Sequence, residues 1–194
     1  MRAYDIVLAL HIIAALAVFG MSTLLHGCEW MARRARTVAE LRPLGTAMGY
    51  GFLMPVLGTT LVALGVVLVL ISPDDEKVGF GDPFVWCGLV AYVLLSASGA
   101  VMAPYSKAIA TAVAAAPDGP IGPELRRVVL ARPGMLVGHM TTALLLAVVV
   151  DMTTKPDALV APLVLAAGLV VGYLAGEAAA RPVAETAAVA TATR

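Results

Sequence analysis

Residues 6–25 read IVLALHIIAALAVFGMSTLL, an uninterrupted apolar run in which His11 is the only ionisable side chain. A bilayer core about 30 Å thick needs roughly 20 mostly apolar residues in a spanning helix, and this run reaches that length. The apolar region of a secretory signal sequence is shorter, about 7 to 15 residues. We therefore interpret the run as a helix that is retained in the mature protein and crosses a membrane.

The composition of the whole chain extends this interpretation. Of its 194 residues, 60% are hydrophobic and only 13% are charged, whereas soluble domains carry about 25% charged residues. The sequence predicts an all-α membrane protein, a bundle of five transmembrane helices in a lipid bilayer that forms one domain over residues 1–176. The expected helices cover about residues 4–27, 50–72, 84–103, 134–150 and 158–176. The net charge is zero, so nothing indicates a nucleic-acid partner.

Lysine and arginine are distributed unevenly between the expected loops. Ten of the 13 follow the first, third or fifth helix, and three lie elsewhere, namely Arg2, Lys77 and Lys155. Because basic residues accumulate in cytoplasmic loops, this distribution predicts an N-terminus outside and a C-terminus in the cytoplasm. We expect a multi-pass protein of the cell membrane, the inner membrane of a bacterium.

The segments between and beyond these helices carry further signals. Pro55 is expected to kink the second helix rather than end it, because neighbouring helices can satisfy the freed carbonyl. Residues 104–133 are expected to form a cytoplasmic helical hairpin. Residues 177–194, rich in Ala and Thr, are expected to be a flexible cytoplasmic tail. Cys28 and Cys87 fall on opposite membrane faces in this topology, so they cannot form a disulfide within one chain.

Glycines recur at four-residue spacing in the last expected helix, at Gly168, Gly172 and Gly176. Small residues at this spacing let another helix backbone approach closely. One interpretation is packing inside the five-helix bundle. The other is a contact with another membrane subunit through the fifth helix.

Three histidines, His11, His26 and His139, are the only ionisable side chains inside the expected apolar segments. Ionisable groups within a membrane are expensive and mark a site by default. On the first helix, His11, His26 and Glu29 share one face, which is expected to point inward. Met135 precedes His139 by one turn, so a thioether and an imidazole lie on one side of the fourth helix.

These residues leave several interpretations open. His11, His26 and His139 are candidate ligands of a b-type haem, and His139 with Met135 is a candidate copper site. The alternatives are a proton relay, disfavoured because no buried Asp or Glu is expected, and plain interhelical hydrogen bonds. At 1.5 Å per residue His11 and His139 differ in depth by about 12 Å, and His26 lies about as far below His139. This offset favours a haem with a single histidine ligand, or with a second ligand from another chain.

Signatures of soluble enzymes are missing from the sequence. It contains no Gly-x-Ser-x-Gly elbow, no His-Glu-x-x-His motif, no Walker loop and no Cys-x-x-Cys pair. We therefore expect a non-enzymatic membrane protein, an accessory subunit or a transport component. The alternative is a membrane redox protein that binds b-type haem or copper through its intramembrane histidines.

Several short motifs, taken together, resemble an uncharacterised family of bacterial integral membrane proteins, domain-of-unknown-function family 2269. They are Leu10-His11, the basic stretch 33–36, Pro104 and the pair Lys155-Pro156. The resemblance covers about residues 4–156. It implies a helical bundle and no particular reaction.

The string 9–14, ALHIIA, is also similar to the first helix of the membrane protoporphyrinogen oxidase family. In that family the corresponding histidine is implicated in haem binding, so the resemblance implies the same role for His11. That family also relies on a lysine within a helix, whereas Lys77, Lys107 and Lys155 all fall in expected loops here. The resemblance therefore extends to His11 alone. A fainter similarity to copper-resistance membrane proteins rests on the same histidine-bearing helix.

Overall fold

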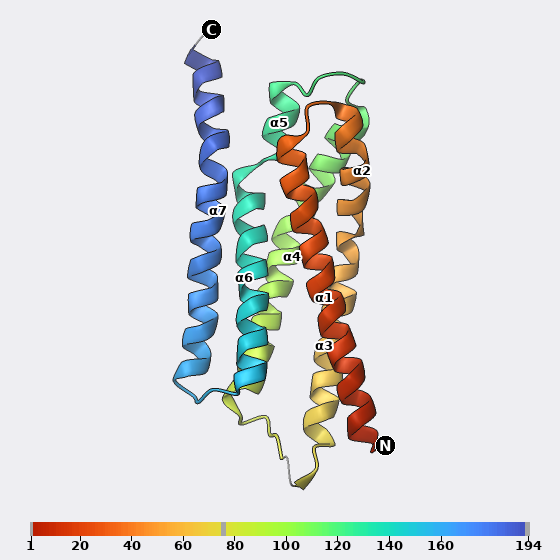
Figure 1. The fold of residues 1–194 in the computed structure, drawn as a ribbon, viewed down its shortest axis with the longest axis vertical. Coiled ribbons are helices and arrows are strands. Elements are labelled where there is room, and N and C mark those ends of the chain that lie inside the picture. The colour runs from red at the N-terminus through yellow and green to blue at the C-terminus, as the bar shows by residue number, and fades with distance from the viewer. Residues whose placement is uncertain (1, 75–76, 193–194) are drawn as a thin grey trace.

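The protein is a bundle of long, nearly parallel helices with its two termini at opposite ends (Figure 1). This computed structural model describes residues 2–74 and 77–192, with side chains described up to Arg181. The helices are α1 (Ala3–Arg34), α2 (Val38–Gly49), α3 (Leu53–Leu70), α4 (Pro83–Ala115), α5 (Pro123–Val129), α6 (Arg132–Thr154) and α7 (Val160–Ala192), with a 3₁₀ turn η1 (Tyr50–Phe52) between α2 and α3. Every named element in these ranges is a helix, and the one β-bridge, between Thr37 and Pro120, is isolated.

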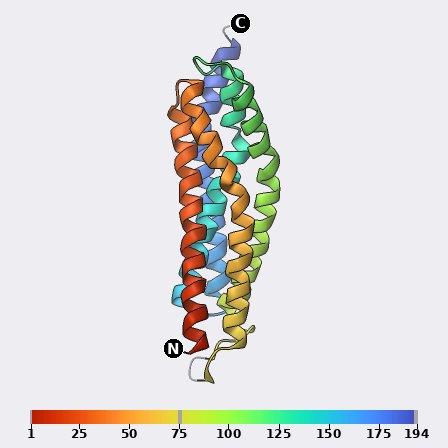
Figure 2. The same ribbon diagram turned by 90° about the vertical axis from the view of Figure 1, so that its right-hand side faces the viewer.

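Within the described residues, five helical paths are long and apolar enough to cross a membrane, which confirms the predicted fold class at that level. They are α1, the path Val38–Leu70, α4, the path Pro123–Thr154 and α7 as far as Arg181. A helix satisfies its own backbone hydrogen bonds, as a segment in lipid must. The side view shows the paths running the length of the molecule (Figure 2).

The helices are longer than the apolar runs that predict them. Helix α1 continues past Gly27 to Arg34, and α4 continues through Pro104 to Ala115. Lys107, expected in a loop, therefore lies within α4. Together with α5, the end of α4 occupies the segment 104–133 where a helical hairpin is expected. Gly119 allows the turn between them, because its φ of +141° is a conformation that other residues rarely adopt.

Pro55 lies at the third position of α3, just after the 3₁₀ turn η1. Proline has no N–H to offer the carbonyl four residues earlier, and its ring crowds that carbonyl. The chain therefore changes helical type at Tyr50–Phe52 and then continues as α3. The path Val38–Leu70 is thus interrupted just before Pro55 but continues beyond it. The continuation agrees with the expectation that Pro55 does not end the helix.

Helix α7 continues to Ala192 and covers most of the segment 177–194 that is expected to form a flexible tail. Residues 193–194 lie outside the described residues. The flexibility of this segment stays a prediction.

Two buried apolar clusters hold the bundle together. The first lies near the end that carries the C-terminus and includes Ala32, Leu41, Ile109, Val113, Val129 and Met135. The second joins α4, α6 and α7 and includes Cys87, Ala91, Leu144, Ala147, Ala161 and Leu165. Cys28 and Cys87 are both free and almost fully buried, at 1% and 0% exposure. Many large apolar side chains on the outer faces of the helices are exposed, as expected for surfaces that contact lipid.

The three glycines of α7 pack against α6 of the same chain. A Cβ added at Gly168 would lie 2.8 Å from the Cβ of Ala147, and one added at Gly176 would lie 2.9 Å from the Cα of Leu136. At Gly172 it would lie 2.8 Å from the carbonyl oxygen of His139. The glycine face is therefore used inside the bundle. A contact with another subunit through α7 stays a prediction, and it would have to use a different face.

Candidate functional site

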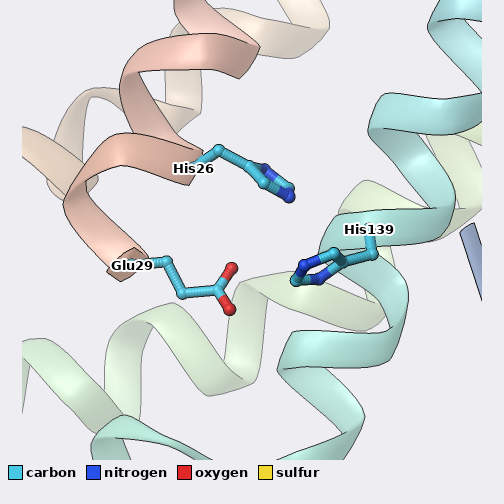
Figure 3. A group of neighbouring side chains, drawn as sticks. All are labelled: His26, Glu29 and His139. Atoms are coloured by element: carbon cyan, nitrogen blue, oxygen red, sulfur yellow. The ribbon is translucent and has the colours of Figure 1, made fainter. Parts of the chain in front are cut away.

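His26, Glu29 and His139 converge between α1 and α6 (Figure 3). One potential ligand atom from each residue lies within 4.8 Å of the others, and all three side chains are half-buried. His26 and Glu29 project from α1 toward His139, which projects from α6 (Figure 3). The cluster therefore brings two imidazoles and one carboxylate from two helices to a single point.

Helix periodicity explains this convergence. His26 and Glu29 are three residues apart, so they lie on one face of α1. Opposite them stands Gly138, whose added Cβ would lie 3.6 Å from Glu29 Oε2 and 3.8 Å from His26 Cε1. The bare backbone at Gly138 leaves space beside His139 for the two side chains of α1.

The backbone of α6 fixes the tautomer of His139. Its Nδ1 lies 2.8 Å from the carbonyl oxygen of Met135. A carbonyl can only accept a hydrogen bond, so Nδ1 carries the proton in the neutral ring, and Nε2 keeps its lone pair. Histidines that bind metals commonly show this arrangement, in which the second ring nitrogen is held by a backbone carbonyl.

His26 is held by a pair of hydroxyl groups. Its Nδ1 lies 3.2 Å from Thr142 Oγ1, which in turn lies 3.0 Å from Ser22 Oγ. Its Nε2 is buried and has no hydrogen-bond partner among the described residues. The rings of His26 and His139 meet edge to face, with centroids 4.7 Å apart and planes at 69°. A buried polar atom without a partner is costly, so an occupant that binds His26 Nε2 would relieve this cost.

Glu29 is shared between the histidine cluster and Arg33. Glu29 and Arg33, one turn apart on α1, form an ion pair. Arg33 also donates from Nη1 to the carbonyl of Ala179 on α7, at 3.3 Å, while its Nε is buried without a partner. Arg33 thereby links α1 to α7 and places a positive charge beside the cluster.

A cavity of about 100 Å³ lies at the cluster, lined by His26, Glu29, Trp30, Arg33 and His139. A water molecule needs about 10–15 Å³ on this measure, whereas pockets for ligands of drug size occupy about 300–1,000 Å³. The cavity therefore suits a metal ion with a few waters. A haem does not fit between His26 and His139, because the macrocycle would have to pass between rings that are already in contact.

The expected depth separation between His26 and His139 is wrong. The expected first helix ends at Gly27, but α1 continues to Arg34, and α6 extends beyond both ends of the expected fourth helix. Counted from the middles of these helices, the two histidines differ in depth by about 5 Å. The charged last turns of α1 move the centre of the helix toward His26, which brings His26 close enough to His139 for the two rings to meet.

His11 lies apart from this cluster. Its Nδ1 is 3.0 Å from the carbonyl oxygen of Leu61 on α3, so it makes an interhelical hydrogen bond. Gly65 makes room for the ring, because an added Cβ there would lie 3.2 Å from His11 Cε1. A role for His11 in haem binding stays a prediction.

Met135 is 2% exposed and packs in the apolar cluster with Ala32 and Leu41. Its carbonyl oxygen forms the contact with His139 described above. Copper binding through the Met135 thioether stays a prediction.

Sequence reasoning places Glu29 on the same face as His26 but assigns it no role in a site. Arg33 enters the prediction of orientation and the basic stretch 33–36 but no site, and Thr142 is not assigned a role. The three-residue spacing of His26 and Glu29 within a helix is the signal that could have found the cluster. Its use requires knowing that the helix continues past Gly27.

The comparisons with known proteins add no relative. No protein-family model, curated protein or solved structure matches the chain. The resemblances to known families described above therefore stay predictions.

Proposed function

We propose that the chain is a multi-pass protein of the bacterial inner membrane that binds a divalent transition-metal ion between α1 and α6. In this proposal the N-terminus is outside and the C-terminus is in the cytoplasm. The connections α1–α2 and α4–α5 lie at the same end of the bundle as the C-terminus (Figure 1). Basic residues gather in and beside the first of these connections, at Arg33, Arg34, Arg36 and Arg42, and follow the second one, at Arg126, Arg127 and Arg132. The positive-inside rule supports a cytoplasmic location for that end.

The observation that carries the metal proposal is the convergence of His26, Glu29 and His139. Two ligands on one ion, each bonded at about 2.0–2.2 Å, lie no more than roughly 4 Å apart. The separation of up to 4.8 Å among the three residues therefore requires closure of about 1 Å, which side-chain rotation provides. His139 Nε2 presents a lone pair, and His26 Nε2 has no other partner.

The donor set indicates the class of ion. Two imidazoles and one carboxylate suit Zn²⁺, Fe²⁺ and other divalent first-row metals, whereas Mg²⁺ and Ca²⁺ prefer oxygen ligands alone. Three protein ligands leave coordination positions open for water or an exchanging ligand. An open site near one membrane surface is consistent with an accessory or transport role that holds and passes on an ion.

Zinc binding to the protein purified in detergent tests this proposal. We expect one Zn²⁺ per chain in a titration against a chelator of known affinity. His26→Ala, His139→Ala and Glu29→Gln should each weaken binding by more than about tenfold, since each removes a ligand. His11→Ala is the matched control and should leave the affinity unchanged. Equal zinc binding by all four variants and the parent protein would contradict the proposal.

A b-type haem on His11 is a second candidate. The bond from His11 Nδ1 to the Leu61 carbonyl leaves Nε2 as the atom that could bind iron. Protein from haem-sufficient cells should then show a Soret band that His11→Ala abolishes and His139→Ala leaves unchanged. A colourless preparation after haem supplementation would remove this candidate.

A further inference from the structure

A buried carboxyl group lies at the end of the bundle opposite to the cluster of His26, Glu29 and His139. Asp151 on α6 is 1% exposed, and neither of its carboxylate oxygens has a hydrogen-bond partner within the part of the chain that the structure describes. Sequence reasoning missed it, because the expected fourth helix ended at Val150 while α6 continues to Thr154. The expectation that no Asp or Glu is buried is therefore wrong.

Asp151 lies near the end of α6, at the end of the bundle where α4 and α7 begin (Figure 1). Helices α4, α6 and α7 pack together here through the second apolar cluster, which includes Cys87 and Ala161, both at 0% exposure. An unpaired carboxylate in such surroundings loses its hydration without compensation, which costs several kcal/mol or more.

The neighbouring charges do not compensate Asp151. Lys155 follows one turn later on α6, but its Nζ lies over the Phe84 ring, 5.7 Å from the centroid. No ion pair within 4 Å joins it to Asp151. Asp82 before α4 and Asp157 before α7 are acidic and accept hydrogen bonds from nearby backbone N–H groups. Among the described residues, no cation neutralises the buried carboxylate.

The apolar lining also argues against a bound metal ion. Sodium and calcium need several oxygen ligands, but the buried side chains of the second apolar cluster, which joins the same three helices, are those of cysteine, alanine and leucine. The hydroxyls of Thr153 and Thr154 already donate to the carbonyls of Val149 and Val150 on their own helix. A proton, in contrast, removes the charge without any further ligand.

We propose that Asp151 is a proton-binding carboxyl that is neutral when α4, α6 and α7 are packed together and that exchanges its proton at the end of the bundle carrying the N-terminus. Asp151 lies three residues before the end of α6, within about 5 Å along the helix of the connection to α7. That connection begins at Lys155, a non-glycine residue with a φ of +47°. This site is independent of the metal cluster.

The proposal predicts a specific chemical reactivity. Dicyclohexylcarbodiimide is an apolar reagent that adds to protonated carboxyl groups. It should modify Asp151 in the full-length protein, as mapped by mass spectrometry of peptides. Above the pH at which the carboxyl ionises, modification should fall about tenfold per pH unit, following the protonated fraction. Asp157, which is exposed, is the internal control and should stay unmodified at neutral pH.

Stability gives a second, independent measurement. Asp151→Asn keeps the shape of the neutral acid and cannot ionise. The thermal stability of the parent protein in detergent should fall as the pH rises above the range where free carboxyls titrate, and this fall should be smaller in Asp151→Asn. Cys87→Ala should keep the pH dependence of the parent protein.

Two results would overturn the proposal. One is the absence of carbodiimide modification at Asp151 together with identical pH dependence in the parent protein and Asp151→Asn. The other is stabilisation of the parent protein, but not of Asp151→Asn, by added sodium or calcium chloride at constant ionic strength. That second result would assign the site to a cation instead of a proton.

Discussion

Replacing Gly172 with alanine should weaken the bundle, because an added Cβ there would meet α6 more closely than one at Gly168 or Gly176. The added Cβ would lie 2.5 Å from the Cα of Met140 and 2.8 Å from the carbonyl oxygen of His139. Both contacts are with backbone, so no flexible side chain can move away. Ordinary contacts of this kind begin at 3.4 Å, so α7 must shift outward by about 1 Å.

The size of the effect follows from this shift. A gap of 0.5–1 Å removes about a quarter to a half of the dispersion energy at each contact along the helix pair. Overpacking of this kind typically costs about 1–3 kcal/mol. For a chain of this length, that loss corresponds to a fall in Tm of about 2–12 °C.

A thiol-reactive fluorescent dye can measure the change in detergent. Cys28 and Cys87 are almost fully buried, so the dye gains access to them only as the bundle opens. Gly20→Ala on α1 is the matched control, since a Cβ there would meet no atom within 4 Å. Alanine is favoured over glycine within a helix by about 0.5–1 kcal/mol, so the control should be neutral or stabilised. Equal Tm values for the two variants would refute the packing argument.

Three further predictions concern the site, the pH dependence and the topology. Arg33→Gln should tighten zinc binding, because it frees Glu29 from its ion pair, whereas Arg34→Gln should leave the affinity unchanged. Weaker binding by Arg33→Gln would contradict this prediction and show that Arg33 supports the site. Hydrogen bonds from the backbone N–H groups at the start of α7 lower the pKa of Asp157. The stability that the ionised Asp157 gives the folded protein is therefore present above the usual aspartate pKa of about 3.9 and is lost as the pH falls below it. Asp157→Asn should show a smaller loss of Tm on acidification than the parent protein, and an equal loss would contradict this assignment. In a background without the two native cysteines, Lys77→Cys should react with an impermeant thiol reagent in intact cells and Ala115→Cys only after lysis; the reverse pattern would invert the proposed orientation.

The five-helix architecture could be predicted from the sequence, because an apolar run of membrane-spanning length leaves the backbone few alternatives to a helix. The run 6–25 identifies α1 without any tertiary information. Helix ends are harder to predict, because a helix can leave the apolar layer and continue as a charged, partly exposed segment. Residues 28–34 do this in α1.

The candidate site depended on those ends. The three histidines could be identified as the ionisable groups of the apolar runs, but their partners could not. The pairing of His26 with His139 depends on how far α1 continues and how α6 packs against it. The burial of Asp151 depends on how other helices pack against the end of α6, which hydropathy along one segment does not reveal.

X-ray absorption spectroscopy at the zinc edge of the zinc-loaded protein tests the central claim most directly. We predict scattering from two imidazole rings and from oxygen ligands at about 2.0–2.1 Å. His26→Ala and His139→Ala should each remove one imidazole from the spectrum, and His11→Ala should remove none. A spectrum without imidazole scattering, or one that all three variants leave unchanged, would contradict a metal site between α1 and α6.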